Sequence, residues 1–118
     1  MTTPPRAAIH LDLDGATDIF RVHDWPYPKE GGLDPLFDDG LPRALDFFDE
    51  EGVKATLFVI GRTVDDALAC SRLREAVARG HEIASHTITH RLLTQLSSDE
   101  KREEIVSSRK KIEDALGV

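Results

Sequence analysis

The chain has 118 residues, and 22 acidic against 15 basic side chains give it a formal net charge of −7. A chain of this length forms one domain, here residues 1–118, with a hydrophobic core that needs no disulfide, and the single cysteine, Cys70, excludes an internal disulfide and a multi-cysteine zinc cage. The negative charge argues against binding to nucleic acid or to an anionic membrane. Since the chain lacks an apolar run near the roughly 18 residues of a membrane helix and residues 1–8 lack the apolar core of a secretory signal, we expect it to be cytoplasmic.

Three short apolar segments have the composition of strands. Residues 7–13 (AAIHLDL) precede the breaker Gly15, and residues 55–60 (ATLFVI) form a nearly continuous apolar run that Gly61 ends. Residues 82–85 form a shorter third segment. A continuous apolar run is typical of a parallel strand that is covered on both faces.

Two helices are predicted around the second strand. The first begins at Leu41, has Pro42 in its first turn and ends before Gly52. The second is predicted to begin at a Thr63 cap and to end at Gly80.

A third helix is predicted at the end of the chain. Ser97 and Glu100 form a capping-box signature at its start, and Gly117 marks its end. The residues predicted to line its inward stripe are Ile105, Ile112 and Leu116. The interleaved charged residues are interpreted as a solvated face: Lys101, Arg102, Glu103, Glu104, Arg109, Lys110, Lys111 and Glu113.

The segment 16–40 is predicted to be a long loop. Its helix-breaking residues are Pro26, Pro28, Pro35 and the pair Gly31–Gly32. Loops of this length are often functional, so Trp25 and Tyr27 are candidates for the wall of a substrate site, with an aromatic anchor on the core as the alternative.

Strands that alternate with helices indicate parallel βα units with right-handed crossovers, and therefore an α/β fold. In such folds functional groups gather at the carboxyl ends of the strands. Asp12 and Asp14 stand at the end of the first strand, and His86 and His90 follow the third. We expect these two polar clusters to lie at the same edge of the sheet.

These four residues have the chemistry of a metal site. If the segment after the third strand turns helically, His86 and His90 project from one face and can share a metal ion. Asp12 and Asp14 point to the same face of a strand, so one carboxylate can complete a site of two histidines and one carboxylate while the other acts as a base. Three protein ligands leave open positions for water. The alternative is a solvated turn beside two surface histidines; the other three histidines, His10, His23 and His81, are predicted to be structural.

Two segments of the chain carry a family resemblance. Residues 52–61 (GVKATLFVIG) and 80–90 (GHEIASHTITH) resemble the polysaccharide deacetylase family, also called the NodB homology domain or carbohydrate esterase 4, and the similarity extends over nearly the whole chain. The resemblance implies a divalent metal, first of all zinc, with Asp14, His86 and His90 as ligands and Asp12 as the catalytic base. It also implies a metal-dependent hydrolase of non-peptide carbon–nitrogen bonds, in which a metal-bound water attacks an N-acetylated carbohydrate or a related small amide.

The first motif departs from the pattern of the family. It has Asp12 and Asp14 separated by a leucine instead of two adjacent aspartates, which resembles a divergent branch that includes cytoplasmic peptidoglycan-deacetylase-like proteins and hydrolases of small amides. Adjacent aspartates do occur at Asp38 and Asp39, but no strand precedes them. We therefore favour Asp12 and Asp14, and interpret the other pair as anionic residues at a helix N-terminus.

The resemblance covers the N-terminal half of the family's domain. The chain is accordingly expected to be a truncated domain, the first half of an incomplete (β/α)7-type barrel, without the second-half motifs that include the general acid. Three strands cannot close a barrel, so the exposed sheet edge is available for pairing, including with a second copy. The alternative functions are a non-catalytic metal-binding or interaction module that retains the ligand triad, and a plain α/β domain that binds no metal.

Overall fold

The computed structural model describes residues 2–27 and 33–118; Pro28 and Gly31–Gly32 of the predicted loop lie outside the described residues. Three parallel strands, β1 (Ile9–Leu13), β2 (Ala55–Val59) and β3 (Glu82–Ser85), form a sheet in the order β1-β2-β3. This arrangement confirms the predicted α/β fold of parallel βα units.

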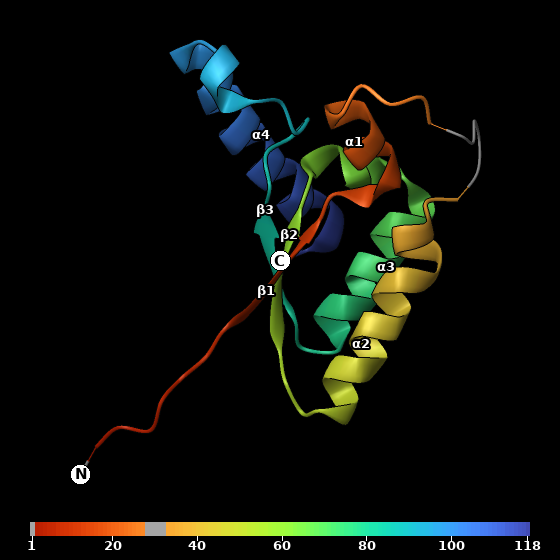
Figure 1. Ribbon diagram of the computed structural model, residues 1–118. Coiled ribbons are helices and arrows are strands. Elements are labelled where there is room, and N and C mark those ends of the chain that lie inside the picture. Colours follow the sequence, from red (N-terminus) through yellow and green to blue (C-terminus); the bar gives the residue numbers. More distant parts are fainter. Residues whose placement is uncertain (1, 28–32) are drawn as a thin grey trace.

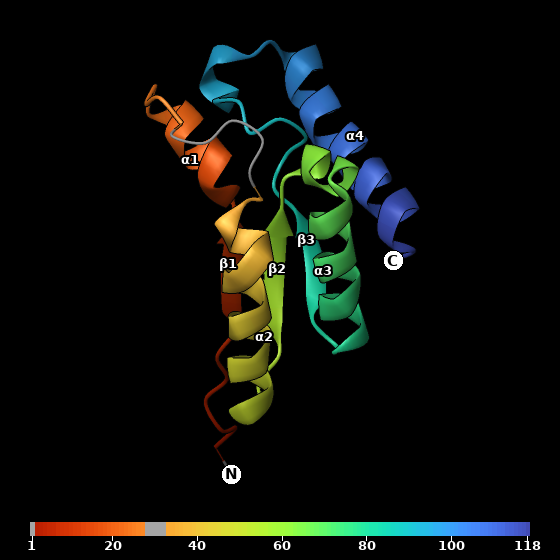
Figure 2. The same cartoon turned by 90° about the vertical axis from the view of Figure 1, so that its right-hand side faces the viewer.

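Two helices cover one face of this sheet, α2 (Leu41–Glu50) and α3 (Ala67–Ala78). Figure 1 shows both helices on the same side of the strands, and Figure 2 shows them in front of the sheet. The core between the layers contains fully buried Leu13, Leu57, Leu45 and Leu73. Side chains of the opposite face are more accessible, and they include the exposed residue Asp12. Asp12 therefore lies on the face of the sheet that α2 and α3 do not cover.

The prediction of a loop over residues 16–40 was wrong in part, because this segment contains the helix α1 (Gly15–Val22) and the π-helical turn η1 (Leu36–Gly40), which continues directly into α2. The Asp34 carboxylate accepts hydrogen bonds from the Ala16 and Leu36 N–H groups, both at 2.9 Å, and so satisfies a free donor of α1 from 18 residues away. Gly15 has φ +74°, and a Cβ atom there would lie 2.8 Å from Asp34 Oδ2. The turn from β1 into α1 thus requires glycine.

The start of α3 also differs from the prediction. Residues Gly61–Asp65 form the 3-10 helix η2, and the N-cap of α3 is Asp66 instead of Thr63. The Asp66 carboxylate accepts a hydrogen bond from the Ala69 N–H at 2.8 Å. Aspartate and threonine are both good caps, so local propensity did not distinguish the two positions.

The 3-10 turn η3 (Leu93–Gln95) leads to α4 (Ser98–Leu116), whose predicted capping box of Ser97 and Glu100 is confirmed, as is its left-handed end at Gly117. The predicted inward stripe was wrong at Ile105, which is 53% exposed. The buried residues of the helix are Glu104, Ser108 and Ile112. Polar side chains are buried here because the helix packs against the polar segment that follows β3, so Glu104 is no part of a solvated face.

None of the helices in the described ranges is both long and apolar enough to cross a membrane.

His81, which enters β3, is a structural residue of the core. It is 4% exposed, packs against the Phe48 ring and accepts a hydrogen bond from the Ala55 N–H on Nδ1 at 3.1 Å. In the described part of the chain Nε2 has no hydrogen-bond partner. Burial, reinforced by the positive charge of Lys54, lowers the pKa of His81 below its ordinary value of 6.5.

We expect the metal-free chain to lose stability as the pH falls below about 6.5, because the unfolded state then binds a proton that native His81 resists. Thermal unfolding between pH 7.5 and 5.5 measures this loss, to which half-buried His90 contributes with the same sign. His81→Asn retains an acceptor for the Ala55 N–H but cannot titrate, so its melting temperature should fall less over the same interval. Exposed His23→Asn is the matched control. Equal pH dependence in His81→Asn and wild type would contradict the prediction.

Candidate metal site

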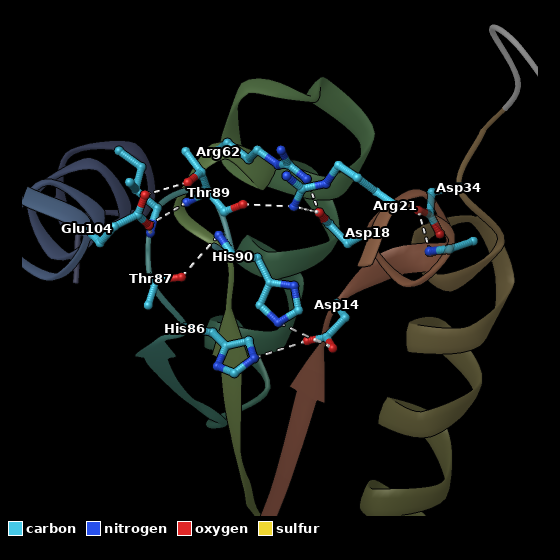
Figure 3. A network of polar contacts seen from close by, with 12 residues as sticks. Asp14, Asp18, Arg21, Asp34, Arg62, His86, Thr87, Thr89, His90 and Glu104 are labelled. Carbon is cyan, nitrogen blue, oxygen red and sulfur yellow. Dashed lines mark hydrogen bonds and ion pairs between the residues drawn. The ribbon is translucent and has the colours of Figure 1, made fainter. Parts of the chain in front are cut away.

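Three side chains from two strand ends meet at the carboxyl edge of the sheet. His86 Nε2 lies 3.3 Å from Asp14 Oδ1, and His90 Nε2 lies 3.7 Å from Asp14 Oδ2. Figure 3 shows both imidazoles directed at the carboxylate. Within residues 2–27 and 33–118, these three residues form a group with one potential ligand atom each, all within 4.8 Å of one another. The expected convergence of the two polar clusters at one sheet edge is therefore observed for Asp14, His86 and His90.

The position of Asp14 follows from the end of β1. Leu13 is fully buried in the core and anchors the strand, and Asp14 is the next residue, just before α1 begins. The left-handed turn at Gly15 then directs the chain into α1. Asp14 is half-buried, with its side chain 21% exposed.

The two histidines are brought together by a bend, and not by the helical turn that their spacing would also allow. The His86 N–H donates to the Val59 carbonyl at 2.8 Å, which prolongs the β2–β3 pairing by one residue. Thr87 and His90 have positive φ values of 64° and 58°. The resulting bend places the centroids of the His86 and His90 rings 4.9 Å apart.

The donor atoms of this cluster fit a divalent cation. In the described structure Asp14 Oδ1 is buried without a hydrogen-bond partner, which is costly unless another group satisfies it. Burial lowers the pKa of His90 against the opposing effect of Asp14, so its imidazole is held in the neutral form that binds metals. Two imidazoles and one carboxylate suit zinc and other divalent transition metals.

Asp12 lies outside this group of three. It is on the sheet face away from α2 and α3, and it is paired in register with Phe58 of β2. Asp12 and Asp14 nevertheless line one pocket of about 380 Å³, whose apolar wall includes Ile19 and Phe20 of α1. A substrate in this pocket would contact both carboxylates.

The alternative aspartates, Asp38 and Asp39, are exposed residues of η1 and lie outside the metal-ligand group. Asp39 instead forms an ion pair with Arg43, one turn further along. This agrees with their interpretation as residues at the beginning of a helix.

The aromatic residues of the predicted loop form a cluster on α1. Phe20 makes edge contacts with Trp25 and Tyr27 at centroid distances of 5.9 and 5.3 Å. Trp25 remains 55% exposed and stacks on His23. Both proposed uses, anchoring and substrate contact, stay predictions.

Sequence reasoning missed the polar residues that surround the two histidines. Asp18 of α1 is buried and forms ion pairs with Arg21 and Arg62, and Arg21 also donates to the Thr89 carbonyl at 2.8 Å. On the other side Glu104 of α4 accepts hydrogen bonds from residues 88 and 89. Figure 3 shows these two groups on opposite sides of the bend. Glu104 and Ser108 are one helical turn apart, and this spacing could have indicated that they share the buried face of α4. Because both residues are polar, the spacing was not interpreted as a buried face.

Comparison with known proteins identifies the class to which this fold and site belong. The family model for polysaccharide deacetylase matches residues 34–118. The chain is 38% identical over 84 residues to a chitooligosaccharide deacetylase of Bradyrhizobium sp. (strain ANU 289), covering 67% of this chain and 37% of the relative. It is 35% identical over 88 residues to the peptidoglycan-N-acetylglucosamine deacetylase PgdA of Listeria monocytogenes, covering 69% and 18%. The chain belongs to the polysaccharide deacetylase family.

Solved structures support the same assignment over more of the chain. A family 4 acetyl xylan esterase from Clostridium thermocellum, in complex with a cobalt ion, superposes with a TM-score of 0.64 at 25% identity. The match covers 94% of this chain and 43% of the esterase. The chain thus spans less than half the length of these relatives, and its fold is part of the barrel-like fold of the family.

Proposed function

We propose that this chain carries the metal-binding part of a deacetylase that hydrolyses an N-acetyl amide on a carbohydrate or on a related small molecule. The observation that carries the proposal is the convergence of Asp14, His86 and His90 at the carboxyl edge of a parallel sheet, in a member of the polysaccharide deacetylase family. Two relatives, a chitooligosaccharide deacetylase and a peptidoglycan-N-acetylglucosamine deacetylase, support the choice of substrate class.

In this proposal Asp14, His86 and His90 hold one divalent cation. When bound, the cation polarises the acetyl carbonyl and lowers the pKa of water. Zinc is the proposed ion, and the cobalt in the acetyl xylan esterase supports a site that also accepts neighbouring transition metals.

Asp12 is the proposed general base. Its carboxylate takes a proton from the attacking water, whose oxygen forms a bond to the acetyl carbon. The carbon–nitrogen bond then breaks, the proton that Asp12 took passes to the leaving nitrogen, and acetate and a free amine are the products. The pocket that Asp12 and Asp14 both line supports this assignment, because one bound molecule could contact both carboxylates.

The experiment is acetate release from N-acetylated chitooligosaccharide by the purified chain. We expect release with zinc or cobalt, loss of release after treatment with a chelator, and recovery when the metal is returned. Acetate release that the chelator does not affect would contradict a metal-dependent reaction.

A second candidate function is a metal-binding module without turnover. The observation that favours it is the exposure of Asp12 on the uncovered sheet face, where its carboxylate is open to bulk solvent. Stoichiometric metal binding without acetate release from any N-acetyl or O-acetyl substrate would support this function over hydrolysis.

A further inference from the structure

We propose that Glu104 is a positioning residue of the metal site: its carboxylate fixes the bend at residues 86–90, and the affinity for the divalent cation depends on it. This inference rests on the proposed function, because it takes Asp14, His86 and His90 as the ligands.

The contacts of Glu104 converge on the two residues midway between the histidines. Glu104 Oε2 accepts hydrogen bonds from the Ile88 N–H at 3.0 Å and the Thr89 N–H at 2.9 Å. Its other oxygen accepts a hydrogen bond from the Thr89 hydroxyl. Three donors from one segment are thus held by one carboxylate, as Figure 3 shows.

The bend that Glu104 holds is conformationally unfavourable by itself. Thr87 has φ 64° although it is β-branched, and His90 has φ 58°. Non-glycine residues persist in this region only when the surrounding structure determines their conformation. A bend with these dihedral angles therefore needs fixed partners on both sides.

Other parts of the fold supply partners for the remaining backbone groups. The Thr87 carbonyl accepts hydrogen bonds from the Gly61 N–H and the Ser108 hydroxyl, both at 2.8 Å. A Cβ atom on Gly61 would lie 2.8 Å from Ser108 Oγ, so α4 approaches η2 as closely as a glycine permits. Glu104 is one turn before Ser108, and this close approach delivers its carboxylate to the bend.

The environment of Glu104 favours the ionised carboxylate. Burial to 4% exposure raises its pKa, but the hydrogen bonds from Thr89 and Ile88 outweigh this effect and the net shift is downward. At neutral pH both oxygens are therefore acceptors, as the three donors require.

The test is the zinc dissociation constant of the purified chain, measured by competition with a chromophoric chelator. Glu104→Ala should raise this constant about 10- to 100-fold, the effect typical of residues that orient metal ligands. Glu104→Gln should restore most of the affinity, because its carbonyl oxygen can accept from both N–H groups and its NH₂ group can donate to the Thr89 hydroxyl. The matched control is Glu103→Ala, an exposed neighbour on the same helix, which should bind zinc like wild type.

Hydrogen exchange of the Ile88 and Thr89 amides gives a readout that does not depend on metal. Both amides should exchange faster in Glu104→Ala than in wild type, and slowly again in Glu104→Gln. If Glu104→Ala does not fold, Thr89→Val, which removes one of the three donors, should show a smaller weakening of zinc binding in the same direction.

Wild-type zinc affinity in folded Glu104→Ala would overturn the inference and leave Glu104 as a residue that only stabilises α4. If wild type itself binds no zinc, the proposed function fails, and the exchange data decide whether Glu104 holds the bend. Unchanged exchange of both amides in Glu104→Ala would overturn the positioning role by itself.

Discussion

Asp12→Asn is expected to reduce the rate of acetate release by about 10²- to 10⁴-fold, the usual contribution of a positioned base, while zinc affinity stays close to that of wild type. The physical reason is the division of roles within the first motif. Asp12 lies outside the group of Asp14, His86 and His90. Its amide variant therefore removes a proton acceptor and leaves the three proposed metal ligands in place.

Asp14→Asn is the matched comparison, because the same chemical change two residues later removes the only carboxylate of the triad. This variant should lose most of its zinc affinity, and with it any turnover. Asp38→Asn with Asp39→Asn is the control for a change in overall charge, and should retain both properties. Loss of zinc in Asp12→Asn together with zinc retention in Asp14→Asn would reverse the roles assigned here.

Much of the fold follows from local patterns in the sequence. The apolar run of β2, the capping box at Ser97 and the glycine at the end of α4 each depend on residues that are close together in the chain. The rule that parallel strands collect functional groups at their carboxyl ends then predicted that the end of β1 and the segment after β3 would meet.

The features that could not be predicted depend on contacts between distant residues. Helix α1 lies in a segment rich in glycine and proline, and Asp34, which caps it, is 18 residues away from Ala16. Glu104 is 15 residues away from Thr89, and because it is a charged residue its one-turn spacing from Ser108 did not indicate burial. The bend at Thr87 depends on contacts with both α4 and η2. The sequence therefore predicted which strand ends carry the candidate ligands, but not the conformation of the segment between His86 and His90.

The aspartate pair illustrates the same distinction. Asp38 and Asp39 have the adjacent spacing typical of the family. Asp14 instead follows the end of β1, where its carboxylate lies next to two histidines. Position in the fold, and not local spacing, brings a carboxylate next to the two histidines, and a metal site requires such convergence in space.

A metal site formed by Asp14, His86 and His90 can be tested by elemental analysis of the purified chain. Wild type and a His86→Ala, His90→Ala variant are incubated with zinc and freed of unbound metal before measurement. A His10→Ala, His23→Ala variant, which loses two exposed histidines away from the cluster, is the matched control.

We expect about one equivalent of zinc in wild type and in the control, and none in the variant that lacks His86 and His90, because a lone carboxylate does not retain the ion. Equal zinc in all three proteins, or no zinc in wild type after incubation, would contradict a metal site at Asp14, His86 and His90.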